Sequence, residues 1–315
     1  MSGVGCILLL PARKRLRGTL DAAPSLQRML ARGDTLEATE SGELGQLTRI
    51  FDVTPLGLPA AALARQFDVG DADVHLWMRA DPAFLQPEMN GVRLMAVGEL
   101  GLRAEESRAL VEALQPLFAE SGMQFSAANT QRWYLRLDAA LRLPRFASPE
   151  EAIGADLAEH LPHGEEGKRW RNLLNEAQVI LHNHPINQAR VNAGKVPANS
   201  LWLWGAGALP DEVIAGVATL FSHEPHACAL AQLAGIEVKL IDSDVLPDAL
   251  DDCAIDLRGA RDLAALETSV IAPLLRRVQQ GKLPALTIDF ADSHAWIYRR
   301  PHALRFWRRP PRDWA

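Results

Sequence analysis

The residues Val4–Leu10, VGCILLL, form a short apolar run that is followed directly by Pro11. A run of this length that ends at a proline is typical of a strand buried on both faces of a parallel sheet. Similar runs return late in the chain, at Ser200–Trp204, Ile236–Ile241, Cys253–Leu257 and Ala285–Phe290. The sequence therefore predicts one sheet that takes strands from both ends of the chain.

Helical patterns lie between the later runs. The segment His226–Ala234 is followed by Gly235, which is a suitable C-terminal cap, and Asp262–Gln280 carries an apolar stripe that ends before Gly281. Alternation of strands and helices is the signature of a doubly wound α/β sheet. We therefore expect the α/β fold class, with a mostly parallel sheet.

The middle of the chain has a different pattern. Strands are predicted at Val74–Arg79, Val92–Val97 and Arg132–Leu137, and an amphipathic helix at Ala104–Glu120. This order is α+β in character, without the alternation of a parallel sheet. We therefore predict a discontinuous core of residues 1–70 and 168–315, interrupted by an inserted α+β domain of residues 71–167.

Composition limits the function classes. The 315 residues carry 33 basic and 39 acidic side chains, a formal charge of −6, which argues against a generally basic nucleic-acid-binding protein. The three cysteines are scattered and form no CxxC motif, so neither a disulfide framework nor a structural zinc site is expected. The first apolar run is far shorter than the ~20 residues of a membrane span, and basic residues follow rather than precede it. These features predict a cytoplasmic protein that has no membrane partner.

The most informative stretch is residues 170–207, WRNLLNEAQVILHNHPINQARVNAGKVPANSLWLWGAG. It reads as a helix that breaks at His184-Pro185, then a polar loop, a strand and a Gly-Ala-Gly turn. Arginine offers a two-pronged fork to anions and a glycine turn exposes backbone N–H groups, so this segment suits a phosphate or carboxylate. The candidate ligand-binding residues are His184, Asn187, Arg190 and Asn199. The alternative is a packed loop in which the asparagines cap turns.

The same stretch, as NE…L…HPIN..R…GK.PAN…LWGAG, resembles cofactor-independent phosphoglycerate mutases of the archaeal type. It is more similar still to their bacterial relatives, the RpfE-type regulatory proteins. The resemblance extends over most of the chain, through VHLWMRADPAFL at Val74–Leu85, the helix Ala104–Phe118, RWYLRL at Arg132–Leu137, and HACALAQLAGIEV at His226–Val238. It implies an alkaline-phosphatase-like core with an inserted second domain, in agreement with the organisation predicted above.

For the mutases, the resemblance also implies a serine nucleophile that takes the phosphoryl group between two divalent metals, which need several aspartate and histidine ligands. This chain departs from that pattern. The first strand runs into Pro11-Ala12 where the family has a metal-binding aspartate, and Ser41 is the nearest match to the nucleophile but lacks the following aspartate. The segment Cys253–Asp262 contains no histidine, and only Asp292 and His294 remain near the last family motif. Two metals cannot be held by this set.

We therefore predict a pseudoenzyme: a non-catalytic regulatory or ligand-sensing relative of the mutases that needs no cofactor. The alternative is an active phosphoglycerate mutase or phosphatase that uses Ser41 and two Mn or Zn ions. The segment Arg299–Ala315 mixes arginines with aromatic side chains, which favours packing or a protein partner over nucleic acid. The expected small-molecule partner is phosphorylated or carboxylated.

Overall fold

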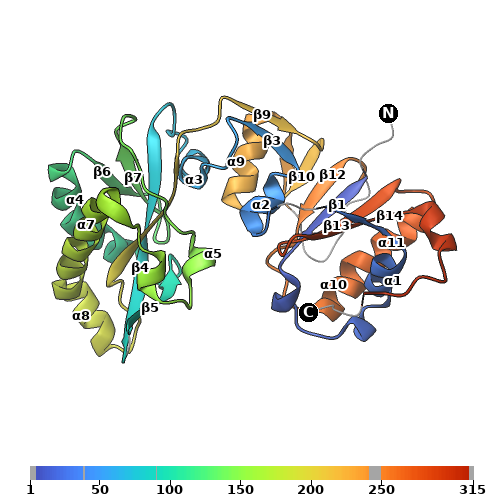
Figure 1. Ribbon diagram of the computed structural model, residues 1–315, viewed down its shortest axis with the longest axis horizontal. Helices are drawn as coiled ribbons and strands as arrows, with labels where there is room; N and C mark the ends of the chain where they lie inside the picture. Colours follow the sequence, from blue (N-terminus) through green and yellow to red (C-terminus); the bar gives the residue numbers. More distant parts are fainter. Residues whose placement is uncertain (1–4, 38–39, 90, 241–249, 312–315) are drawn as a thin grey trace. The chain divides into compact units, whose positions relative to one another are not determined.

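The computed structural model describes residues 5–37, 40–89, 91–240 and 250–311 (Figure 1). The chain forms two compact units, one of residues 1–57 and 211–315 (unit 1) and one of residues 58–210 (unit 2). No helix in the described ranges is long and apolar enough to cross a membrane. Each unit is described by itself.

Unit 1 is built on a seven-stranded sheet with the order β11-β10-β12-β1-β13-β14-β2. The first five strands of this order, β11, β10, β12, β1 and β13, pair in parallel. At the other edge, β14 pairs antiparallel with β13 and with β2. The strand bounds are β1 Cys6–Leu10, β2 Asp34–Leu36, β10 Thr219–Phe221, β11 Glu237–Lys239, β12 Cys253–Asp256, β13 Ala285–Phe290 and β14 His294–Arg299. A separate antiparallel ribbon joins β3, Phe51–Thr54, to β9, Glu212–Ala215.

Helices cover both faces of this sheet. The helices are α1 Pro24–Arg32, α2 Glu43–Leu47, α9 Pro225–Leu233, α10 Leu263–Leu266 and α11 Ala272–Gln279, with short 3₁₀ turns at Arg13–Arg15, Leu20–Ala22 and Arg300–Leu304. Figure 1 shows α1, α10 and α11 on one face and α2 and α9 on the other. A π-helical turn, Glu267–Ile271, joins α10 to α11 just before Pro273, whose missing N–H would interrupt a regular helix there.

Unit 2 contains a five-stranded antiparallel sheet with the path β5-β4-β7-β6, and β8 pairs with the first half of β4. The elements are α3 Ala60–Asp68, β4 Leu76–Glu88, β5 Gly91–Val97, α4 Ala104–Glu120, β6 Gln124–Ala127, β7 Trp133–Leu137, α5 Pro149–Ala152, α6 Leu157–His160, α7 Gly164–Asn183, α8 Pro185–Asn192 and β8 Ser200–Gly207. One face packs against α4 and α7 in the main core, and α3 packs on the other face.

The structure confirms the α/β class, with a mostly parallel sheet and an α+β unit inserted in the chain. The inserted unit spans residues 58–210 instead of the expected 71–167. Its boundaries lie further out because α3 packs on β4 and β8, and because α7 buries its apolar stripe against α4. Both helices therefore belong to unit 2 rather than to the core.

Two elements correct the sequence predictions. The run at Ser200–Trp204 forms β8, which pairs antiparallel with β4 in unit 2 and is not a strand of the parallel sheet. The predicted polar loop after the break at His184 is in fact the helix α8. Pro185 occupies the first helical turn, where its missing N–H costs nothing, and His184 Nδ1 accepts a hydrogen bond from the Ile186 N–H as a cap.

Candidate functional site

The carboxyl ends of the parallel strands in unit 1 gather polar side chains at one edge of the sheet. In open α/β sheets this edge is where ligands bind. Ser222 and Glu224 follow β10, Asp256 ends β12, and Asp289 and Asp292 lie at the end of β13. We call this region the carboxyl edge, and its carboxylates are the groups that a metal at this position would need.

Arg258 occupies the centre of one cluster at the carboxyl edge. Its Nε donates to Asp256 Oδ1 at 2.8 Å and its Nη2 donates to Asp256 Oδ2 at 2.6 Å, a two-pronged pair. The same Nη2 lies 3.3 Å from Glu224 Oε2, and Nη1 donates to the Glu43 carbonyl at 2.8 Å. The Arg258 side chain is 4% exposed, so this cation lies buried between the side chain of Asp256, which is also buried, and that of Glu224, which is partly exposed.

Glu224 and Ser222 complete this cluster. Ser222 Oγ donates to Asp256 Oδ2 at 2.8 Å and accepts the Glu224 N–H at 3.0 Å. Glu224 caps α9 by accepting the N–H groups of His226 and Ala227, and its Oε1 lies 2.5 Å from His226 Nδ1. The oxygens of both carboxylates are thus directed at partners within the protein.

The charges of the cluster stabilise each other. Burial raises the pKa of Glu224, but the neighbouring His226 and the Arg258 guanidinium lower it by more, so the pKa lies well below its ordinary value. Burial lowers the pKa of Arg258, yet its bonds to Asp256 raise it above the usual range. Both groups are therefore held in their charged forms.

The remaining carboxylates of the edge are paired with other arginines. Arg49 binds Asp289 through Nε and Nη2, each at 2.6 Å, and Gln46 Nε2 donates to the carbonyls of Leu10 and Asp289. Arg13 Nε donates to Asp292 Oδ2 at 2.8 Å. Arg49 and Arg13 thus each place a guanidinium against carboxylate oxygens that a metal would otherwise take.

The predicted nucleophile and metal-ligand residues lie at this edge. Arg13 Nη2 is 3.2 Å from His294 Nδ1, so Arg13 contacts both Asp292 and His294. The Gly42 N–H donates to the Ala291 carbonyl at 2.7 Å, which places the exposed Ser41 beside the end of β13. Among the hydrogen bonds of the described residues, none joins Ser41 Oγ to a histidine or a carboxylate. The role of Ser41 as a nucleophile and the roles of Asp292 and His294 as metal ligands stay predictions.

The donor set of the carboxyl edge does not fit a pair of divalent metals. Asp256, Glu224, Asp289 and Asp292 each have a guanidinium within 3.3 Å. Across residues 5–37, 40–89, 91–240 and 250–311, no three His, Cys, Asp or Glu side chains come together in a way that could hold a metal. A metal would have to displace the arginines, and the displaced cation would then lie beside it.

The four residues predicted to bind a ligand lie in unit 2 and contact the protein itself. Asn187 Nδ2 donates to the carbonyls of Leu181 and Ala198, and its Oδ1 accepts the Ala198 N–H. Asn199 bonds both backbone groups of Leu85, at 2.8 Å each. These contacts fit the packed-loop alternative, and the ligand-binding role stays a prediction.

Arg190 has the largest number of these internal contacts. It is 3% exposed, and its Nη1 pairs with Glu106 Oε2 at 2.8 Å. Further N–H groups donate to the carbonyls of Leu100, Gly101 and Val196. The guanidinium therefore joins α8 to the start of α4, two segments that are far apart in the chain.

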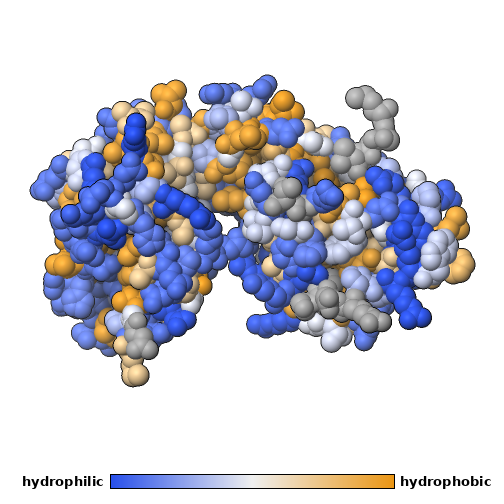
Figure 2. Space-filling view, viewed as in Figure 1, coloured by the Kyte–Doolittle hydropathy of each residue, from blue (hydrophilic) through white to orange (hydrophobic). Residues whose placement is uncertain are grey.

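The segment after β14 is anchored at its start and exposed further on. Arg305 Nη1 and His302 Nε2 lie 2.5 and 3.2 Å from the Asp34 carboxylate. Leu304, Phe306 and Trp307 are 72%, 76% and 67% exposed. Figure 2 shows strongly hydrophilic and hydrophobic residues adjoining at the end of unit 1 where the deep red segment of Figure 1 lies. We call residues 304–309 the basic-aromatic surface.

Sequence reasoning missed Arg258 as the central side chain of the edge. The signal was present as Asp256-Leu257-Arg258 directly after a buried strand. Residues two apart in extended chain point to the same side, so an aspartate and an arginine at this spacing can pair. The partner Glu224, 34 positions away, could be found only from the fold.

Comparisons with known proteins give partial matches. No family model matches the chain. A probable 2,3-bisphosphoglycerate-independent phosphoglycerate mutase of Geobacter sulfurreducens is 32% identical over 152 residues, 48% of this chain and 38% of that protein. The mutase of Methanosarcina mazei is 40% identical over 110 residues, 35% of this chain and 28% of that protein. The matches thus span well under half the length of these relatives.

Two solved structures are also similar. The cofactor-independent phosphoglycerate mutase of Thermoplasma acidophilum has a TM-score of 0.44 at 16% identity, covering 94% of this chain and 90% of the other. A protein of Pyrococcus horikoshii has a TM-score of 0.45 at 13% identity, with coverage of 94% and 87%. The sequence similarities relate this α/β protein to cofactor-independent phosphoglycerate mutases.

The depressed pKa of Glu224 predicts a dependence of stability on pH. A carboxyl group whose pKa is lowered by folding stabilises the fold above its unfolded pKa, and this contribution is lost as the pH falls toward the folded pKa. We expect Glu224→Gln to lower the melting temperature at pH 7 and to flatten its fall below about pH 5. Glu237→Gln, at an exposed site in β11, should keep the wild-type profile. The melting temperatures are measured by circular dichroism as a function of pH. If they fall equally steeply with pH in wild type and in Glu224→Gln, the lowered pKa of Glu224 is contradicted.

Proposed function

We propose that the protein is a non-catalytic regulatory relative of the cofactor-independent phosphoglycerate mutases, of the RpfE type. One observation carries the proposal: Arg258 binds Asp256 and Glu224 at the carboxyl edge, so a fixed cation lies against the carboxylates that a catalytic metal would need. The pairs Arg49–Asp289 and Arg13–Asp292 repeat the arrangement at the end of β13, which β1 separates from β12. Three arginines thus pair with the four carboxylates of the edge without divalent ions.

A regulatory protein acts through partners, and the basic-aromatic surface suits a protein contact. Tryptophan and arginine are enriched among the residues that dominate binding energy at protein interfaces. Here Trp307 and Phe306 are mostly exposed, with ring centroids 5.4 Å apart, and arginines flank them. The anchoring of Arg305 on Asp34 holds this segment to the sheet, which lowers the entropy lost when a partner binds.

The second candidate is an active phosphomutase or phosphatase with Ser41 as the nucleophile. The position of Ser41 favours it, because the bond from Gly42 to Ala291 holds this serine beside the carboxyl edge, and open α/β sheets generally bind ligands at that edge. In that case two Mn or Zn ions would have to enter among the arginine-paired carboxylates.

A turnover assay separates the two candidates. Purified protein is incubated with 3-phosphoglycerate and, in parallel, a phosphate monoester, with Mn²⁺ or Zn²⁺ present, and the Methanosarcina mazei mutase serves as the active control. We expect no turnover above the background of a Ser41→Ala variant. Turnover that depends on metal and disappears in Ser41→Ala would establish the enzyme and refute the regulatory proposal.

A further inference from the structure

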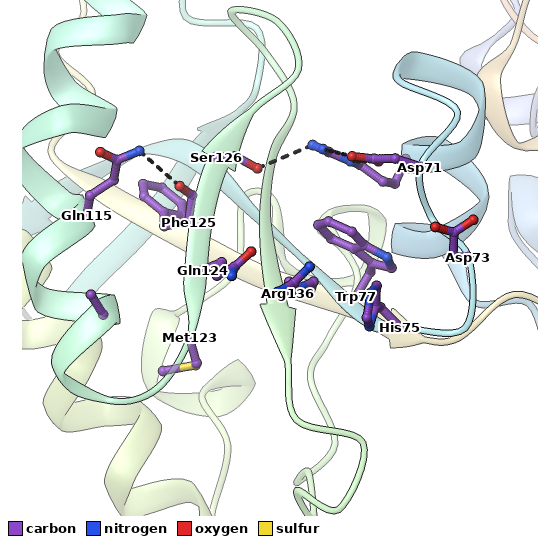
Figure 3. A pocket seen from close by; sticks show the side chains of 12 residues that line it. Asp71, Asp73, His75, Trp77, Gln115, Met123, Gln124, Phe125, Ser126 and Arg136 are labelled. Carbon is purple, nitrogen blue, oxygen red and sulfur yellow. Dashed lines mark hydrogen bonds and ion pairs between the residues drawn. The ribbon is translucent and has the colours of Figure 1, made fainter.

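Unit 2 contains a cavity of about 530 Å³ at the edge strand β6, lined by residues of α3, α4, β4, β6 and β7 (Figure 3). Its floor comes from one row across three strands, because Gln124 of β6 and Trp77 of β4 are both in register with Arg136 of β7. Residues in register share a face of the sheet, and Figure 3 shows Arg136 between Gln124 and Trp77. The volume is in the range of small-molecule sites.

The other arginines on this side of unit 2 have carboxylate partners. Arg65 pairs with Asp71, Arg79 with Asp81 and Arg132 with Asp68, at 2.5 to 2.8 Å. Arg136 differs from them. Within the part of the chain that the structure describes, the Arg136 side chain makes no hydrogen bond and no ion pair. A half-buried guanidinium at the floor of a cavity is therefore available to a ligand.

One wall of the cavity is fixed in place. Arg65 donates to Asp71 through Nε and Nη2 and to Ser126 Oγ through Nη1. Its guanidinium also lies 4.6 Å from the centre of the Trp77 ring. The hydrogen bonds from Arg65 lower the pKa of Asp71, and the charge of Arg136 adds a smaller effect in the same direction. Asp71 is therefore held ionised and hydrogen-bonded to Arg65, while Arg136 keeps its N–H groups for a ligand.

A second charged group lines the cavity beyond Trp77. Asp73 is exposed and follows Asp71 in the loop before β4. Figure 3 shows it on the side of Trp77 away from β6. The charges of Arg65 and Asp71 offset each other in their ion pair. The charged groups that remain for a ligand are the Arg136 guanidinium at the floor and the Asp73 carboxylate at the rim. This arrangement suits a monoanion that carries hydrogen-bond donors at its other end.

We propose that this cavity binds a small carboxylic acid that also bears an amino or hydroxyl group. The carboxylate accepts two hydrogen bonds from the Arg136 fork, and the donor group binds Asp73. A carboxylate fits better than a dianionic phosphate, because a single cation balances a single negative charge. The site lies within unit 2, so the proposal is independent of whether unit 1 catalyses a reaction.

The test uses 4-aminobenzoate as the probe, with benzoate as the analogue that lacks the amine. Dissociation constants come from ligand-observed NMR titration of the full chain. Arg136→Gln should weaken 4-aminobenzoate binding roughly ten-fold, the expected loss for a charge-assisted hydrogen-bonded pair. Arg108→Gln, at an exposed arginine of α4, is the matched control and should bind as wild type does.

A second variant tests the donor end of the site. Asp73 has a φ of 39°, a conformation that asparagine also tolerates, so Asp73→Asn should fold normally. It should remove the preference for 4-aminobenzoate over benzoate and leave benzoate binding unchanged. The proposal is overturned if wild type shows no saturable binding, or if folded Arg136→Gln binds 4-aminobenzoate as tightly as wild type. A preference that persists in Asp73→Asn would overturn the role of Asp73.

Discussion

Replacing Arg258 with alanine should lower the free energy of unfolding of unit 1 by about 3–5 kcal/mol, the usual cost of removing one partner of a buried ion pair. The change leaves Asp256 without its two-pronged partner and removes a cation from Glu224. It also leaves the Glu43 carbonyl without the donor that Arg258 Nη1 supplies. Urea unfolding followed by circular dichroism measures the loss.

Arg261→Ala is the matched control for this prediction. Arg261 lies three residues away, is exposed, and its Nη1 bonds the backbone carbonyls of Arg258 and Ala260. We expect it to cost less than about 1 kcal/mol. Arg258→Lys should give an intermediate loss, because a lysine keeps the charge but cannot make the two parallel bonds to Asp256. Equal stability of Arg258→Ala and Arg261→Ala would contradict the central position of Arg258.

Replacing Arg190 with methionine should destabilise unit 2 by a similar amount, about 3–5 kcal/mol. Glu106, whose side chain is 7% exposed, would lose its buried cation and keep only its contacts with the exposed Arg103, and three backbone carbonyls would lose a donor. Tryptophan fluorescence in urea follows this unit, because most of the tryptophans belong to it, namely Trp77, Trp133, Trp170, Trp202 and Trp204.

A second substitution identifies the cause of that loss. In Glu106→Gln/Arg190→Met the buried carboxylate is gone, so part of the stability should return. Arg108→Met, on the exposed face of the same α4, controls for the loss of an arginine. If Arg190→Met unfolds at the wild-type urea concentration, then the guanidinium does not join α8 to α4, and the ligand-binding prediction for Arg190 gains support.

The sequence was sufficient where burial alone decides the structure. The apolar runs that became β1, β12 and β13 are buried on both faces, and the pattern at Ala104–Glu120 became α4 with the same bounds. The run at Ser200–Trp204 is equally apolar, yet it pairs with β4 of the other sheet. An apolar run shows that a strand is buried, but it does not show which neighbour covers it.

The candidate site was harder to predict because its contacts join distant parts of the chain. Missing histidines and aspartates could be read directly from the sequence at Pro11-Ala12 and in Cys253–Asp262. The arginines that pair with the remaining acids could not, since Arg49 and Asp289 are separated by 240 positions. Arg190 is a second example. From the sequence its guanidinium was predicted to bind an anionic ligand, whereas in the fold it bonds the carboxylate of Glu106.

The central claim is that arginines, rather than metals, balance the carboxylates at the edge of the parallel sheet. The most direct test is the number of Mn²⁺ or Zn²⁺ ions bound per wild-type chain, measured by elemental analysis after equilibration with each metal and removal of the excess. The account predicts a ratio close to zero, with no change in melting temperature on adding a chelator. A ratio close to two, lost in a variant such as Asp292→Asn, would contradict it.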